Sequence, residues 1–142
     1  MPARIAGGQS GGMQTRRPTQ VFIVDDSPSI RVRLIEMLER MEDVTVVGEA
    51  ASAQEAVAGI LRTHPDSVLL DLNLMGRTGL DVMRAVRPRA PDIAFVVLTN
   101  HSEPQYRQAC FDAGARYFLD KSGEFERVRE VIAEIAAPHP GA

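Results

Sequence analysis

The sequence predicts an α/β fold in which a mostly parallel sheet is covered by helices on both faces. Five short apolar runs each predict a strand, at residues 20–24, 45–50, 67–71, 93–99 and 115–119. The longer segments between them repeat apolar residues at helical spacing. The strand segments contain few polar residues, which is expected where both faces of a sheet are covered.

Serines mark the start of the first two predicted helices. Ser27 followed by Pro28 is typical of an N-cap and a first helical position. Ser52 and Glu55 fit a capping box that opens the second helix, which extends to about Arg62. The residues expected to face the sheet are Ile30, Leu34, Ile35, Leu38 and Met41, then Ala56, Val57, Ile60 and Leu61.

Proline and glycine delimit the other three predicted helices. They cover residues 80–86, halted before Pro88, residues 103–113, ended by Gly114, and residues 124–137. Their inward residues are Leu80, Val82, Met83 and Val86, then Phe125, Val128, Val131, Ile132 and Ile135. Five βα units without a repeat or a linker predict one domain.

Composition sets the expected limits of that domain within the 142 residues. Residues 1–19 are rich in Gly, Ser and Gln and carry three arginines and no acid. We therefore expect a disordered N-terminal tail, in which Met13 is an alternative start. We assign residues 20–137 to the domain and 138–142 to a short C-terminal tail, with no output domain.

Charge and cysteine content narrow the function classes. From residue 20 onward the chain has 13 basic and 19 acidic side chains, a net charge of −6, which disfavours nucleic acids and anionic membranes as partners. The sequence has no apolar run long enough to cross a bilayer and no secretory signal. The single cysteine, Cys110, cannot form an internal disulfide and is expected to be a small buried residue. A cytoplasmic protein is the prediction.

Polar residues gather where the predicted strands end. Asp25 and Asp26 follow the first strand, Asp71 ends the third, Thr99 ends the fourth, and Lys121, the only lysine, follows the fifth. The carboxyl ends of parallel strands share one edge of a sheet, so these residues should meet in one crevice. Three carboxylates need a cation, and oxygen ligands favour Mg²⁺. Lysine and threonine can hold phosphoryl oxygens, and an aspartate can accept a phosphoryl group.

Each residue alone has an ordinary explanation. A single aspartate at a strand end is more often a cap or turn residue, Thr99 a strand residue, and Lys121 a solvated charge. The joint pattern, with each required type at the same edge of the sheet, favours a phosphoryl-transfer site.

At these residues the sequence resembles the receiver domain of bacterial two-component response regulators, over residues 20–137. The shared motifs are VDDS at 24–27, DLNLMGRTGLD at 71–81, VVLT at 96–99 and GARYFLDKS at 114–122. The ending KSGEFERV at 121–128 is similar to stand-alone, chemotaxis-regulator-like members. The resemblance implies a flavodoxin-like, doubly wound (βα)5 sandwich with a five-stranded parallel sheet in the order 2-1-3-4-5.

The resemblance also implies a metal site. Asp71 would be the phosphoacceptor, and Asp26 and Asp71 would bind Mg²⁺ through their side chains. Asn73 would contribute its backbone carbonyl, and Asp25 would act through water.

The resemblance further implies a switch. Thr99 and Lys121 would hold the phosphoryl oxygens, and Phe118 would turn inward when Thr99 moves toward the phosphate. Phosphorylation would then shift the packing of the face formed by the helix at 103–113, the strand at 115–119 and the helix at 124–137. A downstream protein is expected to bind this face.

The leading functional hypothesis is a single-domain response regulator, which accepts a phosphoryl group from a sensor histidine kinase or a histidine phosphotransfer protein. It would not be an enzyme beyond self-catalysed phosphorylation and dephosphorylation, and would be a monomer or a phosphorylation-dependent dimer. Two alternatives stay open: an intermediate carrier that passes the group to a histidine phosphotransfer protein, and a phosphate-independent binding module.

Two enzyme or cofactor readings are disfavoured. A phosphohydrolase of the haloacid dehalogenase type needs a second aspartate where this chain has Asn73. A flavodoxin-like cofactor binder would need a glycine- and hydroxyl-rich first turn, whereas the turn here is DDSPS at 25–29.

The chain departs from the family pattern at several positions. Met75 stands where proline is common, which would loosen that loop. Ser122 follows Lys121 where the family usually has a proline, often in a cis bond. A cis bond is costly before other residues, and a trans bond here would alter the coupling of this loop to the last helix; the sequence leaves the state of the bond open.

Three more positions surround the expected phosphoacceptor. Asn100 is larger than the small residue common there, which would restrict access to Asp71. Asn73 and His101 lie where the family varies its autodephosphorylation rate, so we expect the lifetime of the acyl phosphate to depend on them.

Overall fold

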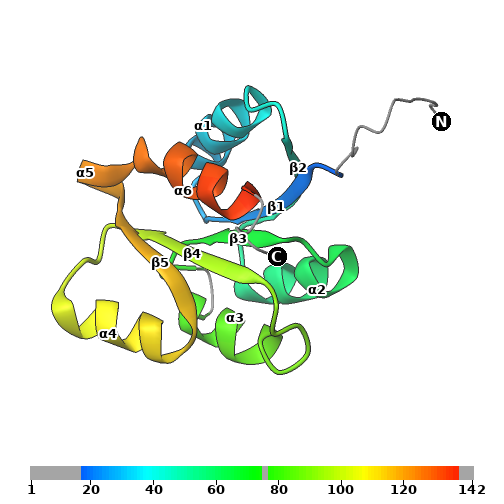
Figure 1. Cartoon of the computed structure of the whole chain (residues 1–142). Coiled ribbons are helices and arrows are strands. Elements are labelled where there is room, and N and C mark those ends of the chain that lie inside the picture. Colours follow the sequence, from blue (N-terminus) through cyan, green and yellow to red (C-terminus); the bar gives the residue numbers. More distant parts are fainter. Residues whose placement is uncertain (1–16, 75–76, 138–142) are drawn as a thin grey trace.

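The computed structural model describes residues 17–74 and 77–137, and the predicted sheet is present (Figure 1). Its five parallel strands lie in the order β2-β1-β3-β4-β5, which is the order that the resemblance implies. The strands are β1 (Thr19–Val24), β2 (Val44–Ala50), β3 (Ser67–Leu70), β4 (Ala94–Thr99) and β5 (Ala115–Asp120). The fold is therefore the flavodoxin-like doubly wound sandwich.

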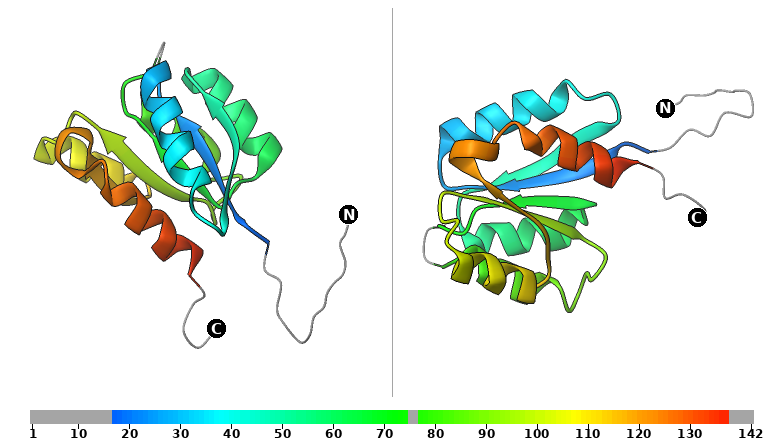
Figure 2. Two further views of the ribbon diagram at one scale, coloured as in Figure 1. Left: turned by 90° about the horizontal axis from the view of Figure 1, so that it is seen from above. Right: turned by 60° about the vertical axis from the view of Figure 1, so that its left-hand side comes forward.

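Helices cover both faces of the sheet, with α1 and α6 on one side and α2, α3 and α4 on the other (Figures 1 and 2). The helices are α1 (Pro28–Glu39), α2 (Ala53–Thr63), α3 (Gly79–Val86), α4 (Pro104–Asp112), α5 (Lys121–Glu124) and α6 (Arg127–Ala136). Of the described residues in α4, Cys110 alone is buried. The expected burial of Cys110 is confirmed.

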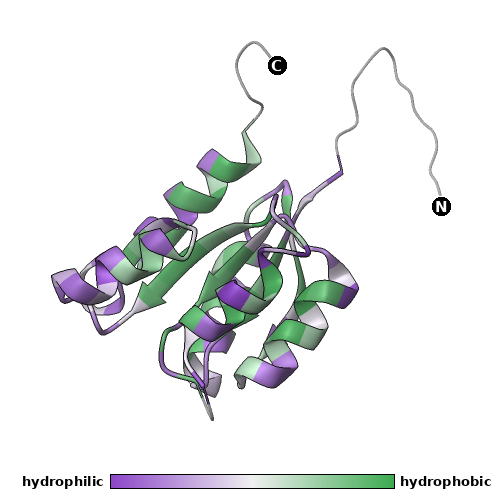
Figure 3. Ribbon diagram, turned by 90° about the horizontal axis from the view of Figure 1, so that it is seen from below, coloured by the Kyte–Doolittle hydropathy of each residue, from purple (hydrophilic) through white to green (hydrophobic). Residues whose placement is uncertain are grey.

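The core is divided into two layers by the sheet. Alternate residues of a strand point to opposite faces, so Val21 and Ile23 pack with α1 and α6, whereas Phe22 and Val24 pack with α2 and α3. Every residue of β3 and β4 is buried, which matches their low polarity. Figure 3 shows the apolar sides of the helices turned toward the sheet.

Side-chain caps fix where the helices begin. Ser27 accepts a hydrogen bond from the Ile30 amide and Ser52 accepts one from the Glu55 amide, as predicted. The Glu55 carboxylate lies 3.5 Å from the amide nitrogen of Ala51 rather than returning to Ser52, so only half of the expected capping box forms. A complete capping box occurs instead at Thr78 and Asp81, which the sequence analysis missed.

The predicted start of the last helix, at residue 124, is wrong, because α6 begins at Arg127. A single turn, α5, begins at Lys121, and α6 follows as a separate helix. The cause is Asp120, whose carboxylate accepts hydrogen bonds from the amide of Ser122 at 2.9 Å and from its hydroxyl at 2.7 Å. The described residues contain no cis peptide bond, so the Lys121–Ser122 bond is trans.

The first strand begins one residue earlier than predicted. It begins at Thr19, and Arg17 forms an ion pair of 2.8 Å with Asp66. The predictions for residues 1–16, including the alternative start at Met13, and for Met75 and 138–142 lie outside the described residues. No helix among the described residues has both the length and the apolarity needed to cross a bilayer.

Gly79 permits a close approach beneath the phosphoacceptor candidate, and this generates a prediction. A Cβ atom at position 79 would lie 2.4 Å from the backbone oxygen of Asp71. Gly79→Ala should therefore lower the free energy of unfolding by about 1–3 kcal/mol, as overpacking does. Urea unfolding followed by circular dichroism measures this.

Gly123 provides the matched control, because a Cβ atom there would meet nothing within 4 Å. Gly123→Ala, in the short helix α5, should be neutral or stabilising by up to about 1 kcal/mol. Equal stability losses in the two variants would contradict the role given to Gly79.

Candidate functional site

Three carboxylates meet at the carboxyl edge of the sheet. Asp25 and Asp26 follow β1, and Asp71 follows β3, the neighbouring strand. One oxygen of each lies within 4.8 Å of the others. Asp25 and Asp71 are only 2% and 5% exposed, whereas Asp26 is open to solvent. The predicted convergence is confirmed.

Lys121 is the cation that faces this cluster. Its Nζ atom lies 2.7 Å from Asp25 Oδ2 and 3.0 Å from Asp71 Oδ2, and its side chain is 10% exposed. Burial alone would lower the pKa of Lys121, but its hydrogen bonds and charge interactions with the two carboxylates outweigh that effect and raise the pKa. The lysine is therefore held in its charged form.

Asp25 has opposing influences. Burial raises the pKa of Asp25, and the hydrogen bonds from Lys121 and from the Ser27 amide only partly offset it. The negative charge of Asp71 acts in the same direction as burial. A divalent cation at this position would relieve the repulsion between the carboxylates.

A second set of contacts crosses the mouth of the site. The backbone amide of Asn73 donates to Asp71 Oδ1 at 3.3 Å, and the side-chain Nδ2 of Asn73 lies 2.6 Å from His101 Nε2. The His101 amide donates to Thr99 Oγ1 at 3.2 Å, and Thr99 is fully buried. The loops after β3 and β4 are thus joined above Asp71.

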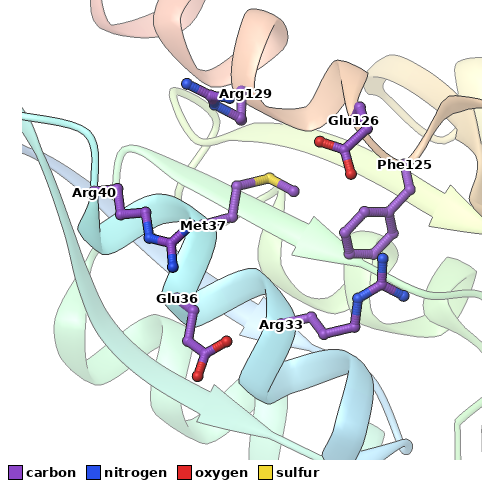
Figure 4. Close-up of a pocket in the computed structure, with 7 residues that line it drawn as sticks. All are labelled: Arg33, Glu36, Met37, Arg40, Phe125, Glu126 and Arg129. Carbon is purple, nitrogen blue, oxygen red and sulfur yellow. The ribbon is translucent and has the colours of Figure 1, made fainter.

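One hollow opens on the carboxylates, and a second lies beside it. The first, about 400 Å³, is lined by Asp26, Asp71, Asn73, Asn100 and Lys121 together with neighbouring residues of α1 and α5. The second, about 350 Å³, is the groove between α1 and α6 shown in Figure 4. Arg33 and Phe125 line both, and the Arg33 guanidinium lies 4.1 Å from the centre of the Phe125 ring.

The predicted switch residue Phe118 is only 5% exposed. Its ring lies 6.5 Å from that of Phe111 on α4, and the Arg107 guanidinium is 5.4 Å from its centre. Phe118 belongs to β5, and these contacts show that its side chain packs against α4. Its role as a switch stays a prediction.

Two arginines of α1 that lie at the site were not predicted from the sequence. Arg31 donates to the backbone oxygen of Asp25 at 2.7 Å, and Arg33 lines the hollow in front of Asp71. A signal for Arg31 existed, because a basic residue in the first turn of a helix opposes the helix dipole and calls for a compensating partner.

The donor set fits a hard divalent cation. Three carboxylates within reach of one ion, completed by a backbone carbonyl and water, are the oxygen ligands that Mg²⁺ takes in proteins. The described residues offer no comparable cluster with histidine or cysteine ligands. A carboxylate next to an ammonium group and a cation site can accept a phosphoryl group.

The ion pairs of Lys121 generate a prediction on stability. Lys121→Met should lower the free energy of unfolding at pH 7 without Mg²⁺ by roughly 3 kcal/mol, because two buried carboxylates lose their cation. The loss should shrink as the pH falls, because burial raises the pKa of Asp25 and its protonated carboxyl no longer needs a cation. Urea unfolding at neutral and at acidic pH measures it.

Arg127→Met is the control for Lys121→Met. Arg127 pairs with Glu124 at 2.6 Å, but its side chain is 53% exposed, so its loss should cost less than about 1 kcal/mol. A Lys121→Met variant as stable as the wild type at pH 7 would contradict the assignment of a buried, coupled site.

Comparison with known proteins agrees with this geometry. The Haemophilus influenzae nitrate/nitrite response regulator protein homolog is 32% identical over 117 residues, which cover 82% of this chain and 56% of that protein. The transcriptional activator protein ExaE of Pseudomonas putida is 32% identical over 84% of this chain and 56% of its own length. The chain thus spans about half the length of the curated relatives it matches.

A solved structure shows the same fold. The crystal structure of a LuxR-family two-component response regulator from Aurantimonas sp. SI85-9A1 matches with a TM-score of 0.77 and 32% identity, covering 84% of this chain and 86% of that one. The family of response regulator receiver domains matches residues 21–133, which include every residue of the carboxylate cluster and Lys121. The chain belongs to the response regulator receiver domain family.

Proposed function

We propose that this receiver domain is a phosphoacceptor switch, in which Asp71 accepts a phosphoryl group from a phosphohistidine. The observation that carries the proposal is the position of Asp71, which lies in the three-carboxylate cluster and 3.0 Å from Lys121 Nζ. The donor would be a sensor histidine kinase or a histidine phosphotransfer protein.

The proposed transfer balances without another reactant. A carboxylate oxygen of Asp71 attacks the phosphorus, a P–O bond forms, and the P–N bond to the donor histidine breaks. The electron pair of that bond stays on the histidine nitrogen. Lys121 would hold one phosphoryl oxygen and the Thr99 hydroxyl another.

The metal proposal follows the donor set. Asp26 and Asp71 would hold Mg²⁺ with their side chains, Asn73 with its carbonyl, and Asp25 through water. Bound Mg²⁺ would neutralise the charge that the phosphoryl group brings into this acidic site. The domain would have no enzymatic activity beyond its own phosphorylation and dephosphorylation.

The output is proposed to be protein binding. Movement of Thr99 toward the phosphate would let Phe118 shift, and so alter the face formed by α4, β5 and α6. We propose that this receiver domain works in the cytoplasm, as a monomer or as a phosphorylation-dependent dimer. One relative, ExaE of Pseudomonas putida, is named a transcriptional activator protein. An output through DNA is therefore one alternative to test, and a role as an intermediate phosphate carrier is another.

The first experiment is intact-mass measurement after incubation with acetyl phosphate and Mg²⁺. The wild type should gain one phosphoryl adduct that requires Mg²⁺ and is removed by hydroxylamine, because acyl phosphates react with that nucleophile. Asp71→Asn should gain none, since it lacks the accepting oxygen. An adduct on Asp71→Asn, or none on the wild type, would count against the phosphoacceptor proposal.

The bridge between Asn73 and His101 predicts the lifetime of the acyl phosphate. His101→Ala removes the 2.6 Å contact between the loops after β3 and β4, which opens Asp71 to water. The phosphorylated variant should lose its phosphoryl group several-fold faster, as measured by the decay of the adduct.

His64 is the matched control for this prediction. It lies at the end of α2, before β3 begins, and so at the opposite edge of the sheet from Asp71. His64→Ala should leave the lifetime unchanged. An unchanged or longer lifetime in His101→Ala would contradict a shielding role for the bridge.

A further inference from the structure

We propose that Arg31 is a positioning residue for the metal site: together with Glu49 it fixes the turn that carries Asp25 and Asp26, and thereby strengthens Mg²⁺ binding. The inference rests on the proposed function, which supplies Mg²⁺ as the ligand of this site. It adds a role for two residues that would not touch the metal themselves.

Arg31 joins three elements at one point. Its Nη1 atom donates to the backbone oxygen of Asp25 at 2.7 Å, and its Nε atom donates to Glu49 Oε1 at 2.7 Å. The arginine lies in the first turn of α1, Asp25 follows β1, and Glu49 lies on β2. The Arg31 side chain is only 18% exposed, so these charge-assisted hydrogen bonds are partly shielded from water.

A basic residue such as Arg31 is unfavourable in the first turn of a helix, so its two contacts are needed to offset this cost. The first turn of a helix carries a partial positive charge, and a basic side chain there is unfavourable. No acidic residue occupies the first turn of α1. The Asp25 carbonyl and the Glu49 carboxylate are the groups that compensate the arginine, and both lie outside the helix.

The turn needs such a restraint most at Asp26. The Asp25 carboxylate is already held by the Ser27 amide at 2.9 Å and by Lys121 at 2.7 Å. The Asp26 carboxylate makes no hydrogen bond or ion pair with the described part of the chain. The orientation of the Asp26 carboxylate therefore depends on the backbone that precedes it. Arg31 restrains this backbone through its hydrogen bond to the Asp25 carbonyl.

Positioning and simple charge repulsion predict opposite outcomes. A positive guanidinium beside an acidic cluster repels a cation, so on charge alone its removal would strengthen Mg²⁺ binding. If Arg31 instead holds the turn in a geometry that binds the metal, its removal weakens binding. The sign of the change separates the two roles.

The experiment is a Mg²⁺ titration of the full chain, followed by the NMR shifts of the backbone amides of residues 25–27 and 71–73. Arg31→Ala should raise the dissociation constant for Mg²⁺ about tenfold, as loss of an outer-shell partner does. Glu49→Gln should raise it less, because the bond from Arg31 to the Asp25 carbonyl remains. Arg31→Ala combined with Glu49→Gln should bind Mg²⁺ no more weakly than Arg31→Ala alone.

Arg40→Ala is the matched control, because it removes the same charge from the far end of α1, where Arg40 is the C-cap. It should leave the Mg²⁺ affinity unchanged. Urea unfolding of each variant checks the fold. If Arg31→Ala does not fold, Arg31→Lys tests the proposal, because it keeps the positive charge but not the paired donors of the guanidinium: charge alone then predicts an unchanged Mg²⁺ affinity, and positioning predicts a weaker one.

The contrary outcomes are distinct. Equal or tighter Mg²⁺ binding in Arg31→Ala, equal or tighter binding in Arg31→Lys if Arg31→Ala does not fold, or an equal loss in Arg40→Ala would overturn the positioning role and leave the proposed function intact. Failure of the wild type to bind Mg²⁺ at all would overturn both.

Discussion

The rest of the site depends on the repulsion among three carboxylates placed together at one edge of the sheet. Asp25 and Asp71 are buried, so solvent screens their charges poorly. Lys121 compensates part of this charge, with its ammonium group within 3.0 Å of both. The site therefore keeps a net negative charge, and this charge is what attracts a cation.

The sheet makes this arrangement possible. Parallel strands deliver their carboxyl ends to the same edge, and β1 and β3 are neighbours because the chain order reverses beside β1. Gly79 lets the start of α3 lie against the backbone of Asp71. Two apolar layers, with β3 and β4 entirely buried between them, hold these strand ends in a fixed relation.

The five strands and the meeting of Asp25, Asp26 and Asp71 were predicted from the sequence, because apolar runs and the polar residues at strand ends are local signals. The strand order followed from the resemblance to receiver domains. The short helix α5, which begins at Lys121, was not predicted, because it depends on a hydrogen bond from the Ser122 amide to the Asp120 side chain. The Arg31–Glu49 pair was missed because it joins α1 to β2, and no local pattern specifies which strand lies beside a helix. The contact of Asn73 with His101 likewise spans two loops.

The thin attachment of α4 has an energetic consequence. A helix that buries only Cys110 has little apolar surface to lose when it moves, so its displacement is cheap compared with that of α1, which buries Leu34 and Leu38. If the proposed switch operates, a small difference in interaction energy at the edge of the sheet would shift the population between two positions of α4. The weak packing of this one helix would then set how sensitively the surface responds to the charge at the site.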